Sequence, residues 1–196
     1  MAKRSQADAE KTRQQLLEEA TTLFATKGYS ETSISDICDA AQITKGALFH
    51  HFKSKQALFL EIWTNLQVSM DSEARRAAIA ARSLSDPYSA FLAGCRTYLT
   101  YATRRDYQKI VLIDGPSILG MKGWYEQDHD LGSQNVLAGV RYLAKKGIVE
   151  EHRVRALAIM LQSALNGSGF ALSREQDGIT KETVYDAFET LVKSLR

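Results

Sequence analysis

The sequence is poor in the features that mark secreted and membrane proteins. Of its 196 residues only 2 are cysteine, and Cys38 and Cys95 lie far apart, with no CxxC pair and no histidine at zinc-ligand spacing. We interpret them as small buried hydrophobic residues rather than a disulfide, because cytosolic chains rarely keep disulfides. Apolar runs such as 110–113 are far shorter than the roughly 18 residues that cross a bilayer, and no apolar segment of a secretory signal follows the charged start. We therefore expect a soluble, cytoplasmic protein that contacts no membrane.

Proline is equally scarce, with 2 residues, and net charge is small. Alanine, leucine, glutamate, lysine, arginine and glutamine are abundant, and alternating β-branched runs are few, so the composition favours helices. The net charge of +2, from 25 basic and 23 acidic residues, does not by itself indicate a nucleic-acid binder. Residues 40–60, however, contain several lysines and histidines and no acid. Such a patch suits either a DNA backbone or an ordinary solvated face, and charge alone does not decide between them.

The first third of the chain has the pattern of four helices joined by short turns. A stripe of apolar residues predicts a helix over 7–27. Ser33 and Asp36 have the spacing of a capping box, which predicts the start of a short helix. Thr44 is a candidate N-cap for a second short helix, and Ser54 for a longer one.

Helical patterns continue through the rest of the chain. Asp86 and Pro87 predict a helix start, as N-cap and first helical residue. A glycine-rich stretch over 115–123 is expected to interrupt the helical pattern. Beyond it, apolar periodicity predicts three more helices, over 131–146, 154–172 and 184–195.

Two short helices about four residues apart, the second beginning at Thr44, are typical of a helix-turn-helix. A recognition helix needs small or hydrogen-bonding residues at its N-terminus, so that its backbone can settle into the major groove. Gly46 and Ala47 are small, and Ala47 also suits contact with a thymine methyl group. Thr44 and Lys45 supply hydrogen-bond donors at the same place.

The joint pattern of the N-terminal segment is more specific than two short helices. It consists of Gly28-Tyr29-x-x-Thr32-Ser33-Ile34-x-Asp36-Ile37, followed by Ala41-Gln42-Ile43-Thr44-Lys45-Gly46-Ala47-Leu48-Phe49-His50-His51-Phe52-Lys53-Ser54-Lys55-x-x-Leu58. This pattern resembles the N-terminal domain of the TetR/AcrR family of transcriptional regulators. The resemblance is strong over about the first 65 residues, and beyond them it rests on length and helical character.

The resemblance implies an all-α fold with two parts. An N-terminal three-helix DNA-binding domain over 1–54, with its helix-turn-helix at about 33–52, is joined by a connecting helix to a helical bundle over 55–196. The bundle is expected to bind an unknown small-molecule effector and to form a homodimer. The expected function is that of a ligand-released repressor that binds a double-stranded, pseudo-palindromic DNA operator, with no enzymatic activity.

The resemblance also assigns DNA-binding residues. Ser33 and Ser35 lie on the supporting helix, where members of the family touch phosphate or a base edge. The base-reading surface comprises Thr44, Lys45, Gly46 and Ala47. The backbone-contact positions are Phe49, His50, His51, Lys53 and Lys55. Phe49 stands where many members have tyrosine, so no phenol can bond a phosphate, and Gln42 stands where glycine is common, at a cost of about 1 kcal/mol if its φ is positive.

A cluster of aromatic and soft side chains between residues 98 and 125 fits either core packing or a ligand pocket. The candidate pocket residues are Tyr98, Tyr101, Asp114, Met121, Trp124, Tyr125 and Asn166. The two C-terminal helices are too apolar for the outer layer of a monomer, which predicts a two-fold four-helix interface between copies of the chain. The candidate interface residues are Leu157, Leu161, Ala164, Leu165, Phe188, Leu191 and Val192.

Signals for catalysis, metals or cofactors are weak. His50 and His51 point about 100° apart on a helix and cannot readily share one ion. Asp128-His129-Asp130 has metal-ligand chemistry but no partner cluster, and Ser168 lacks the spacing of a hydrolase elbow. We therefore expect no catalytic residue, metal or cofactor. The alternative is a helical small-molecule-binding or enzymatic bundle that carries a vestigial helix-turn-helix.

Overall fold

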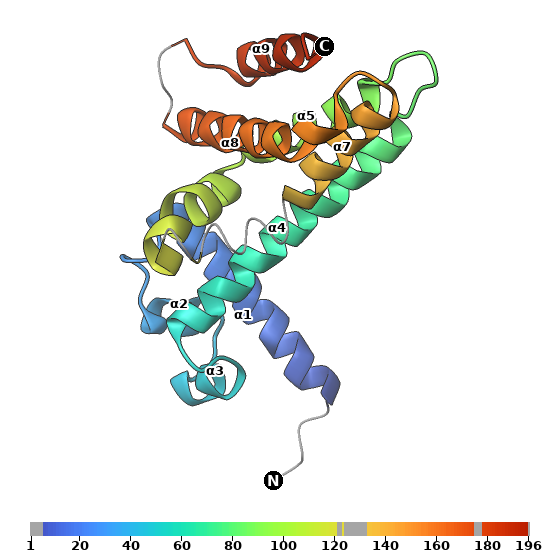
Figure 1. The fold of residues 1–196 in the computed structure, drawn as a ribbon. Coiled ribbons are helices and arrows are strands. Elements are labelled where there is room, and N and C mark those ends of the chain that lie inside the picture. The colour runs from blue at the N-terminus through green and yellow to red at the C-terminus, as the bar shows by residue number, and fades with distance from the viewer. Residues whose placement is uncertain (1–5, 121–122, 124–132, 175–177, 196) are drawn as a thin grey trace.

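A computed structural model describes residues 6–120, 123, 133–174 and 178–195, and all regular secondary structure in these ranges is helical. The helices are α1 (Gln6–Lys27), α2 (Ile34–Ala40), α3 (Lys45–His51), α4 (Lys55–Ala80), α5 (Ser89–Tyr101), the π-helix η1 (Tyr107–Asp114), α7 (Ser133–Lys145), the short 3₁₀-helix η2 (Glu151–Arg153), α8 (Val154–Ser173) and α9 (Lys181–Lys193) (Figure 1). The predicted all-α class is confirmed.

The starts of α2, α3 and α4 are set by polar N-caps. The Ser33 hydroxyl accepts a hydrogen bond from Asp36 N–H at 3.0 Å, and the Asp36 carboxylate accepts one from Ser33 N–H at 2.8 Å. Thr44 and Ser54 cap α3 and α4 in the same way, each accepting from the N–H three residues on. These bonds satisfy backbone donors that a helix start leaves free. The three predicted helix starts are therefore confirmed.

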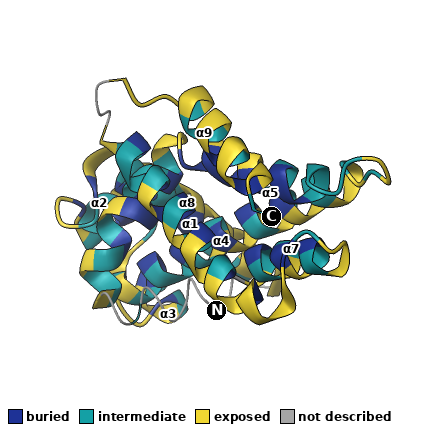
Figure 2. Ribbon diagram, turned by 45° about the horizontal axis from the view of Figure 1, so that its top comes forward, coloured by how far each residue is buried: buried dark blue, intermediate teal, exposed yellow. Residues whose placement is uncertain are grey.

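Helices α1, α2 and α3 pack around a small apolar core that also receives the first turns of α4 (Figure 2). Its largest fully buried side chains come from all four helices and are Leu16, Phe24, Ile37, Leu48, Leu58 and Phe59. Since α3 has only seven residues, burying Leu48 turns its opposite side to solvent.

The long helix α4 connects the two parts of the molecule. It packs against α1 and η1 near its start and against α5 over its remaining turns (Figure 1). Beyond it, α5, α7 and α8 complete a bundle, and α9 lies on α5, where the Arg96 guanidinium stacks 4.4 Å from the centre of the Tyr185 ring. A movement of the bundle can therefore reach the N-terminal helices through α4.

Two predicted boundaries differ from the structure. Helix α5 begins at Ser89, later than predicted, because Asp86 accepts a hydrogen bond from Tyr88 N–H at 2.9 Å and caps a turn that precedes the helix. The expected break after Asp114 is wrong for residues 115–120, which are helical. Proline has no N–H to bond, and the π-helix before Pro116 shifts the carbonyl groups that its ring would meet in a regular α-helix.

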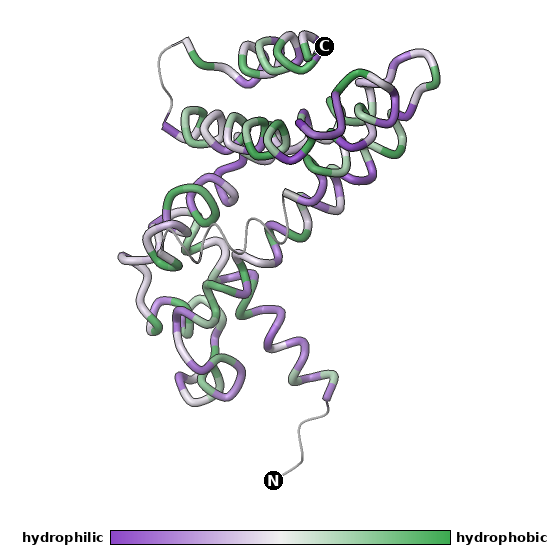
Figure 3. The backbone as a smooth tube through the Cα atoms, in the orientation of Figure 1, coloured by the Kyte–Doolittle hydropathy of each residue, from purple (hydrophilic) through white to green (hydrophobic). Residues whose placement is uncertain are grey.

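None of the helices within the described ranges combines the length and the apolar character needed to span a bilayer. Helix α8 is nevertheless more hydrophobic than α1 (Figure 3). Part of that apolar surface faces the core, and part of it is exposed.

Candidate nucleic-acid interface

Helix α3 presents a small, polar N-terminal surface to solvent. Thr44, Lys45 and Gly46 are exposed, and Ala47 is partly exposed. A side-chain carbon added at Gly46 would meet nothing closer than the Thr44 hydroxyl at 3.9 Å. The predicted base-reading residues therefore share one open surface, which leaves room for a base edge to approach the α3 backbone.

Aromatic and basic groups continue this surface beyond the first turn of α3. Phe49 is 49% exposed, an unusual position for a large apolar ring, and His50 and Lys53 are exposed beside it. His51 is half-buried, and its ring lies 5.4 Å from that of His50. An exposed ring next to cationic and hydrogen-bonding groups suits the sugar-phosphate edge of a groove.

Ser33 and Ser35 flank the same surface on α2, where Ser33 is exposed and Ser35 half-buried. The Ser33 oxygen caps α2, which leaves its O–H proton able to bond an acceptor. Hydrogen bonds from Ser33 hold the pKa of the Asp36 carboxyl below its usual value, so this acid is ionised. Its charge stabilises the N-terminus of α2.

The structure gives Lys55 an internal role. Its ammonium donates to the carbonyl oxygens of Tyr29 and Thr32, each at 2.9 Å, and lies 4.1 Å from the centre of the Tyr29 ring. Two of its three N–H donors are therefore used within the chain, where they tie the start of α4 to the turn after α1. Lys53, two residues after the end of α3, is exposed and is the better placed of the two for a phosphate.

In the turn between α2 and α3, Gln42 has a φ of 54° and is exposed. The condition under which glutamine carries a cost at this position is therefore met. Asn and Gly adopt this conformation at less cost than Gln does. Backbone geometry at the turn therefore outweighs the local preference of the side chain.

A cavity of about 480 Å³ lies between α4, α5, α7 and α8. Of the predicted pocket residues, Tyr98 lines it; Asn166 is not among the lining residues but accepts a hydrogen bond from the Tyr98 hydroxyl at 3.3 Å. Its other lining residues are Met70, Ala74, Arg75, Ala78, Ile79, Arg82, Ala90, Phe91, Gly94, Cys95, Gln134, Asn135, Val136, Ala138, Gly139, Tyr142, Gln162 and Leu165. Sequence reasoning missed most of these, although small residues at spacings of three and four on both α4 and α5 give the signal of a space between helices.

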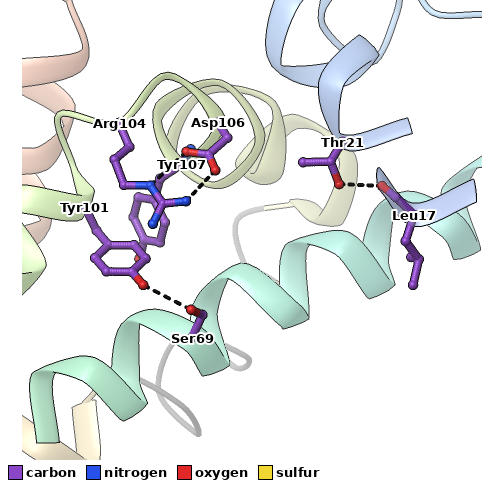
Figure 4. Close-up of polar contacts among 7 residues, drawn as sticks. All are labelled: Leu17, Thr21, Ser69, Tyr101, Arg104, Asp106 and Tyr107. Carbon is purple, nitrogen blue, oxygen red and sulfur yellow. Dashed lines mark hydrogen bonds and ion pairs between the residues drawn. The ribbon is translucent and has the colours of Figure 1, made fainter. Parts of the chain in front are cut away.

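Two predicted pocket residues lie elsewhere. Tyr101 bonds the Ser69 hydroxyl at 3.0 Å, and its ring makes an edge-to-face contact with that of Tyr107 (Figure 4). Asp114 is at the junction of the two parts of the molecule, where its carboxylate accepts from Tyr29 N–H at 2.8 Å and from the Lys109 ammonium at 3.2 Å. Both are corrections, because interactions with distant helices, which sequence does not show, direct these side chains. Met121, Trp124 and Tyr125 lie outside the described residues.

The predicted dimer residues divide into two groups. Leu161, Leu165, Phe188 and Val192 are buried within their own chain, so the prediction is wrong for these side chains. Leu157 and Ala164 are half-buried, and Leu191 is 46% exposed. The exposed apolar side chains on α8 are instead Ile159 and Met160, 67% and 65% exposed, with the small residues Ala156, Ser163 and Gly167 on the same side.

In the described part of the chain, no three or more His, Cys, Asp or Glu side chains gather as a metal site would require. His50 and His51 lie side by side on α3, and residues 128–130 are outside the described ranges. Ser168 bonds the Ala164 carbonyl oxygen one turn back on α8.

Helix α3 is capped and has an open N-terminal surface, and one long helix joins this region to a bundle that contains a cavity. These features define a helix-turn-helix protein with a ligand-sized site. The family described as "Bacterial regulatory proteins, tetR family" matches residues 16–62, and "Tetracyclin repressor-like, C-terminal domain" matches residues 88–195. The chain belongs to the TetR family.

Named relatives agree with this assignment. The chain is 52% identical over 63 residues, 32% of its length, to the probable acrEF/envCD operon repressor of Escherichia coli, of which the match covers only 29%. It is 28% identical over 164 residues to the transposon Tn10 TetC protein of Escherichia coli, covering 83% of this chain and 78% of that one. A solved TetR-family transcriptional regulator from Pectobacterium atrosepticum superposes with a TM-score of 0.81 at 30% identity, over 98% of this chain and 97% of that one.

Proposed function

We propose that this protein is a transcriptional repressor that binds a pseudo-palindromic operator as a homodimer and releases it when a small molecule enters the cavity. We assign DNA binding to residues 1–54 and effector binding and dimerisation to residues 55–196, and no catalytic activity. The observation that carries this function is the open N-terminal surface of α3, with Gly46 at its centre. The operon repressor of Escherichia coli, whose similarity to this chain is confined to a segment of 63 residues, supports it.

In the proposed complex each protomer sets α3 into one major groove. The two half-sites then lie about 34 Å apart, one helical turn, or a multiple of that distance. Ser33, Ser35, Phe49, His50 and Lys53 would hold the sugar-phosphate backbone on either side. We infer a cytoplasmic location for the protein, since that is where such an operator would lie.

The exposed apolar side of α8 is our proposed dimer surface. Two copies of Ile159 and Met160, with the small residues beside them, would bury large apolar groups that a monomer leaves in water. Leu191 on α9 would extend this surface. The dimer sets the distance between the two copies of α3.

Release by a ligand requires that the ligand bind one arrangement of the protein better than another. The cavity lies between α4 and its neighbours, and α4 begins beside α3. A ligand that favours a different tilt of α4 would change the separation of the two recognition helices, and its effect is limited to its difference in affinity for the two arrangements.

Selection of bound sequences from a random DNA pool tests the proposed function. We expect recovery of a two-fold related site with half-sites one or more turns apart. Recovery of no sequence above the input pool at low salt would reject DNA-binding regulation and favour the alternative of a vestigial helix-turn-helix on a binding or enzymatic bundle.

On the recovered site, Gly46→Ala tests the role of α3 directly. A methyl group fits at this position without a clash and improves helix propensity by up to about 1 kcal/mol, so the fold should be as stable as before. The same methyl group would occupy the space into which the groove must fit, and we expect operator affinity to fall at least tenfold. Unchanged affinity would show that α3 does not enter the groove.

Lys53→Ala and Lys145→Ala form a matched pair of exposed lysines, one beside α3 and one on α7. Each phosphate contact contributes about 0.9 to the slope of log affinity against log salt. We expect Lys53→Ala to reduce the slope by about 1 for all sequences and Lys145→Ala to leave it unchanged. Equal slopes in both variants would remove Lys53 from the interface.

A further inference from the structure

The cavity in the bundle is long rather than round. Its lining on α4 begins at Met70 and extends to Arg82 just past the end of that helix, twelve residues or about 18 Å at the helical rise. Small residues on facing helices create this space, and they are Ala74, Ala78, Ala90, Gly94 and Ala138. A ligand that fills it must itself be elongated.

The middle of the cavity is apolar. Phe91, Val136 and Leu165 supply hydrophobic surface from three different helices. Cys95 also lines this part, and burial raises the pKa of its thiol, so the sulfur stays protonated and behaves as a small apolar group. This section favours an unreactive hydrocarbon body and forms no covalent bond to it.

One end of the cavity carries a polar group that lacks a partner. Gln162 donates through Nε2 to Asn166 Oδ1 at 3.0 Å, and the Tyr98 hydroxyl donates to the same oxygen. The Gln162 Oε1 atom is buried and has no hydrogen-bond partner among the described residues. If the side-chain amides of Gln162 and Asn166 were both rotated by a half turn, which exchanges oxygen and nitrogen, the Gln162 N–H group would lack a partner instead. A hydroxyl group on a ligand, which both donates and accepts, satisfies Gln162 in either orientation.

The other end of the cavity is positively charged. Arg82 lies at this end and Arg75 lies seven residues nearer Met70, and they are the only charged side chains among the described residues that line the cavity. Arg75 pairs with Asp71 at 3.4 Å, and the same carboxylate accepts a hydrogen bond from Asn135. Arg82 makes no side-chain hydrogen bond or ion pair within the described ranges, so its guanidinium is available to an anion.

From this distribution of charge and polarity, we propose that the cavity binds an amphipathic carboxylate. Its acid group bonds Arg82, its elongated hydrocarbon body fills the middle, and a hydroxyl group at the far end bonds Gln162. This ligand class rests on the proposed function only in treating the cavity as the effector site. A cationic ligand of the same length would bring its charge to the guanidinium groups and leave Gln162 unmatched.

Isothermal titration calorimetry of the purified full chain, without DNA, tests the ligand class. The probes are 10-hydroxydecanoate, decanoate, 1,10-decanediol and decyltrimethylammonium. We expect 10-hydroxydecanoate to bind most tightly and decanoate and the diol to bind roughly tenfold more weakly, since each lacks one polar contact. The ammonium probe should not bind at the same concentrations. Tighter binding of the cationic probe, equal binding of the diol and the hydroxyacid, or binding of none of the four would overturn the proposal.

Two variants assign the two ends. Arg82→Gln should weaken binding of decanoate about tenfold and leave the diol unchanged, whereas Gln162→Leu should make 10-hydroxydecanoate no better than decanoate. Arg76→Gln, at an exposed arginine of α4 outside the lining, is the control and should bind all probes as the parent protein does. A loss of carboxylate preference in Arg76→Gln as well as Arg82→Gln would show a non-specific charge effect and reject the site. Because no DNA is present, failure here leaves operator binding untouched, and failure of operator binding leaves these titrations valid.

Discussion

At the scale of single residues, the turn of the helix-turn-helix holds local strain. Gln42 adopts a φ of 54°, a conformation that costs an ordinary L-residue roughly 1–2 kcal/mol relative to glycine. The turn is nevertheless ordered, because Ile43 N–H bonds the Cys38 carbonyl oxygen at 3.0 Å and Thr44 begins α3. The surrounding bonds impose the conformation on Gln42.

We expect Gln42→Gly to raise stability by about 1 kcal/mol, or less where the greater freedom of glycine in the unfolded chain offsets the gain. For a chain of this size 1 kcal/mol corresponds to a Tm about 2–4 °C higher. Gln42→Ala is the control, since it removes the side chain and keeps the strain. An equal rise in Tm for both variants in calorimetry would assign the effect to the side chain rather than to φ.

The caps at Ser33, Thr44 and Ser54 could be predicted because each depends on a few neighbouring residues. Lys55 could not be placed from the sequence in the same way. Its partners, the Tyr29 and Thr32 carbonyl groups, are more than twenty residues away, and only the packing of α4 against the turn after α1 brings them together. A basic residue near a DNA-binding helix is therefore predictable, while its partner is not.

At the scale of elements, η1 differs from the other helices in its wide turns. Gly115 N–H bonds the Ile110 carbonyl oxygen, five residues back, directly before Pro116. Gly115 also lies against Trp63 of α4, because a carbon added at Gly115 would stand 2.8 Å from the indole nitrogen. That indole is fully buried, and its N–H has no partner within the described ranges. The contact joins α4 to η1 where the two parts of the molecule meet.

We expect Gly115→Ala to destabilise the protein by about 1–3 kcal/mol, because neither the indole nor the Ile110 carbonyl group, 3.2 Å from the added carbon, can move freely. Thermal unfolding should show a Tm lower by several degrees. Gly46→Ala is the matched control, a helical glycine with open space around it, and its Tm should stay equal or rise. A loss of Tm in both variants would mean that helix geometry, and not the contact with Trp63, sets the cost.

Sequence predicted the long α-helices, but it predicted neither η1 nor the helical residues 115–120 that follow it, and it failed where tertiary contacts decide. The helices that contain Leu16, Leu48 and Leu58 follow apolar periodicity, because their apolar residues recur on the side that is buried. Periodicity does not tell a helix side that faces its own core from one that faces another molecule. This is why Leu161, which is buried in its own chain beside the exposed Met160 on α8, was predicted to lie at an interface.

At the scale of the whole molecule, the exposed side of α8 is the surface that we propose for assembly. Ile159 and Met160 stand in water without contributing to the core. Their substitution should therefore leave the monomer fold intact. Dimerisation, if it uses this surface, depends on them.

We expect Met160→Lys to convert a dimer into a monomer in analytical ultracentrifugation while its helical signal and monomer fold remain. Two buried lysines facing each other across a two-fold axis would cost several kcal/mol through desolvation and repulsion. Val68→Lys, at an exposed apolar residue of α4, is the control and should not change the molecular mass. A Met160→Lys protein that stays dimeric would place the interface elsewhere.

The junction between the two parts of the molecule passes through Asp114. Its carboxylate accepts from Tyr29 N–H at the turn after α1, while Lys109 holds it from within η1. Gly28, with a φ of 86°, lets the chain turn beside Lys109. A side-chain carbon at position 28 would lie 2.7 Å from the Lys109 side chain. We expect a carboxylate that bonds both parts to help fix the direction in which α3 points.

Asp114→Ala should loosen that direction. One base pair inserted at the centre of the operator moves the half-sites about 3.4 Å apart and turns them by about 35°. The parent protein, with its recognition helices held in place, should strongly prefer the original spacing. Asp114→Ala should bind the original operator several-fold more weakly, because a freer junction must become ordered on binding. Its preference for the original spacing should fall roughly tenfold, which is the size expected for the loss of one hydrogen bond to a charged group. Asp114→Asn, which keeps an acceptor for Tyr29 N–H, should retain most of the preference. If fluorescence anisotropy on the two operators gives the same affinity ratio for the parent and Asp114→Ala, then Asp114 does not set the spacing, and the α4 helix alone carries the connection.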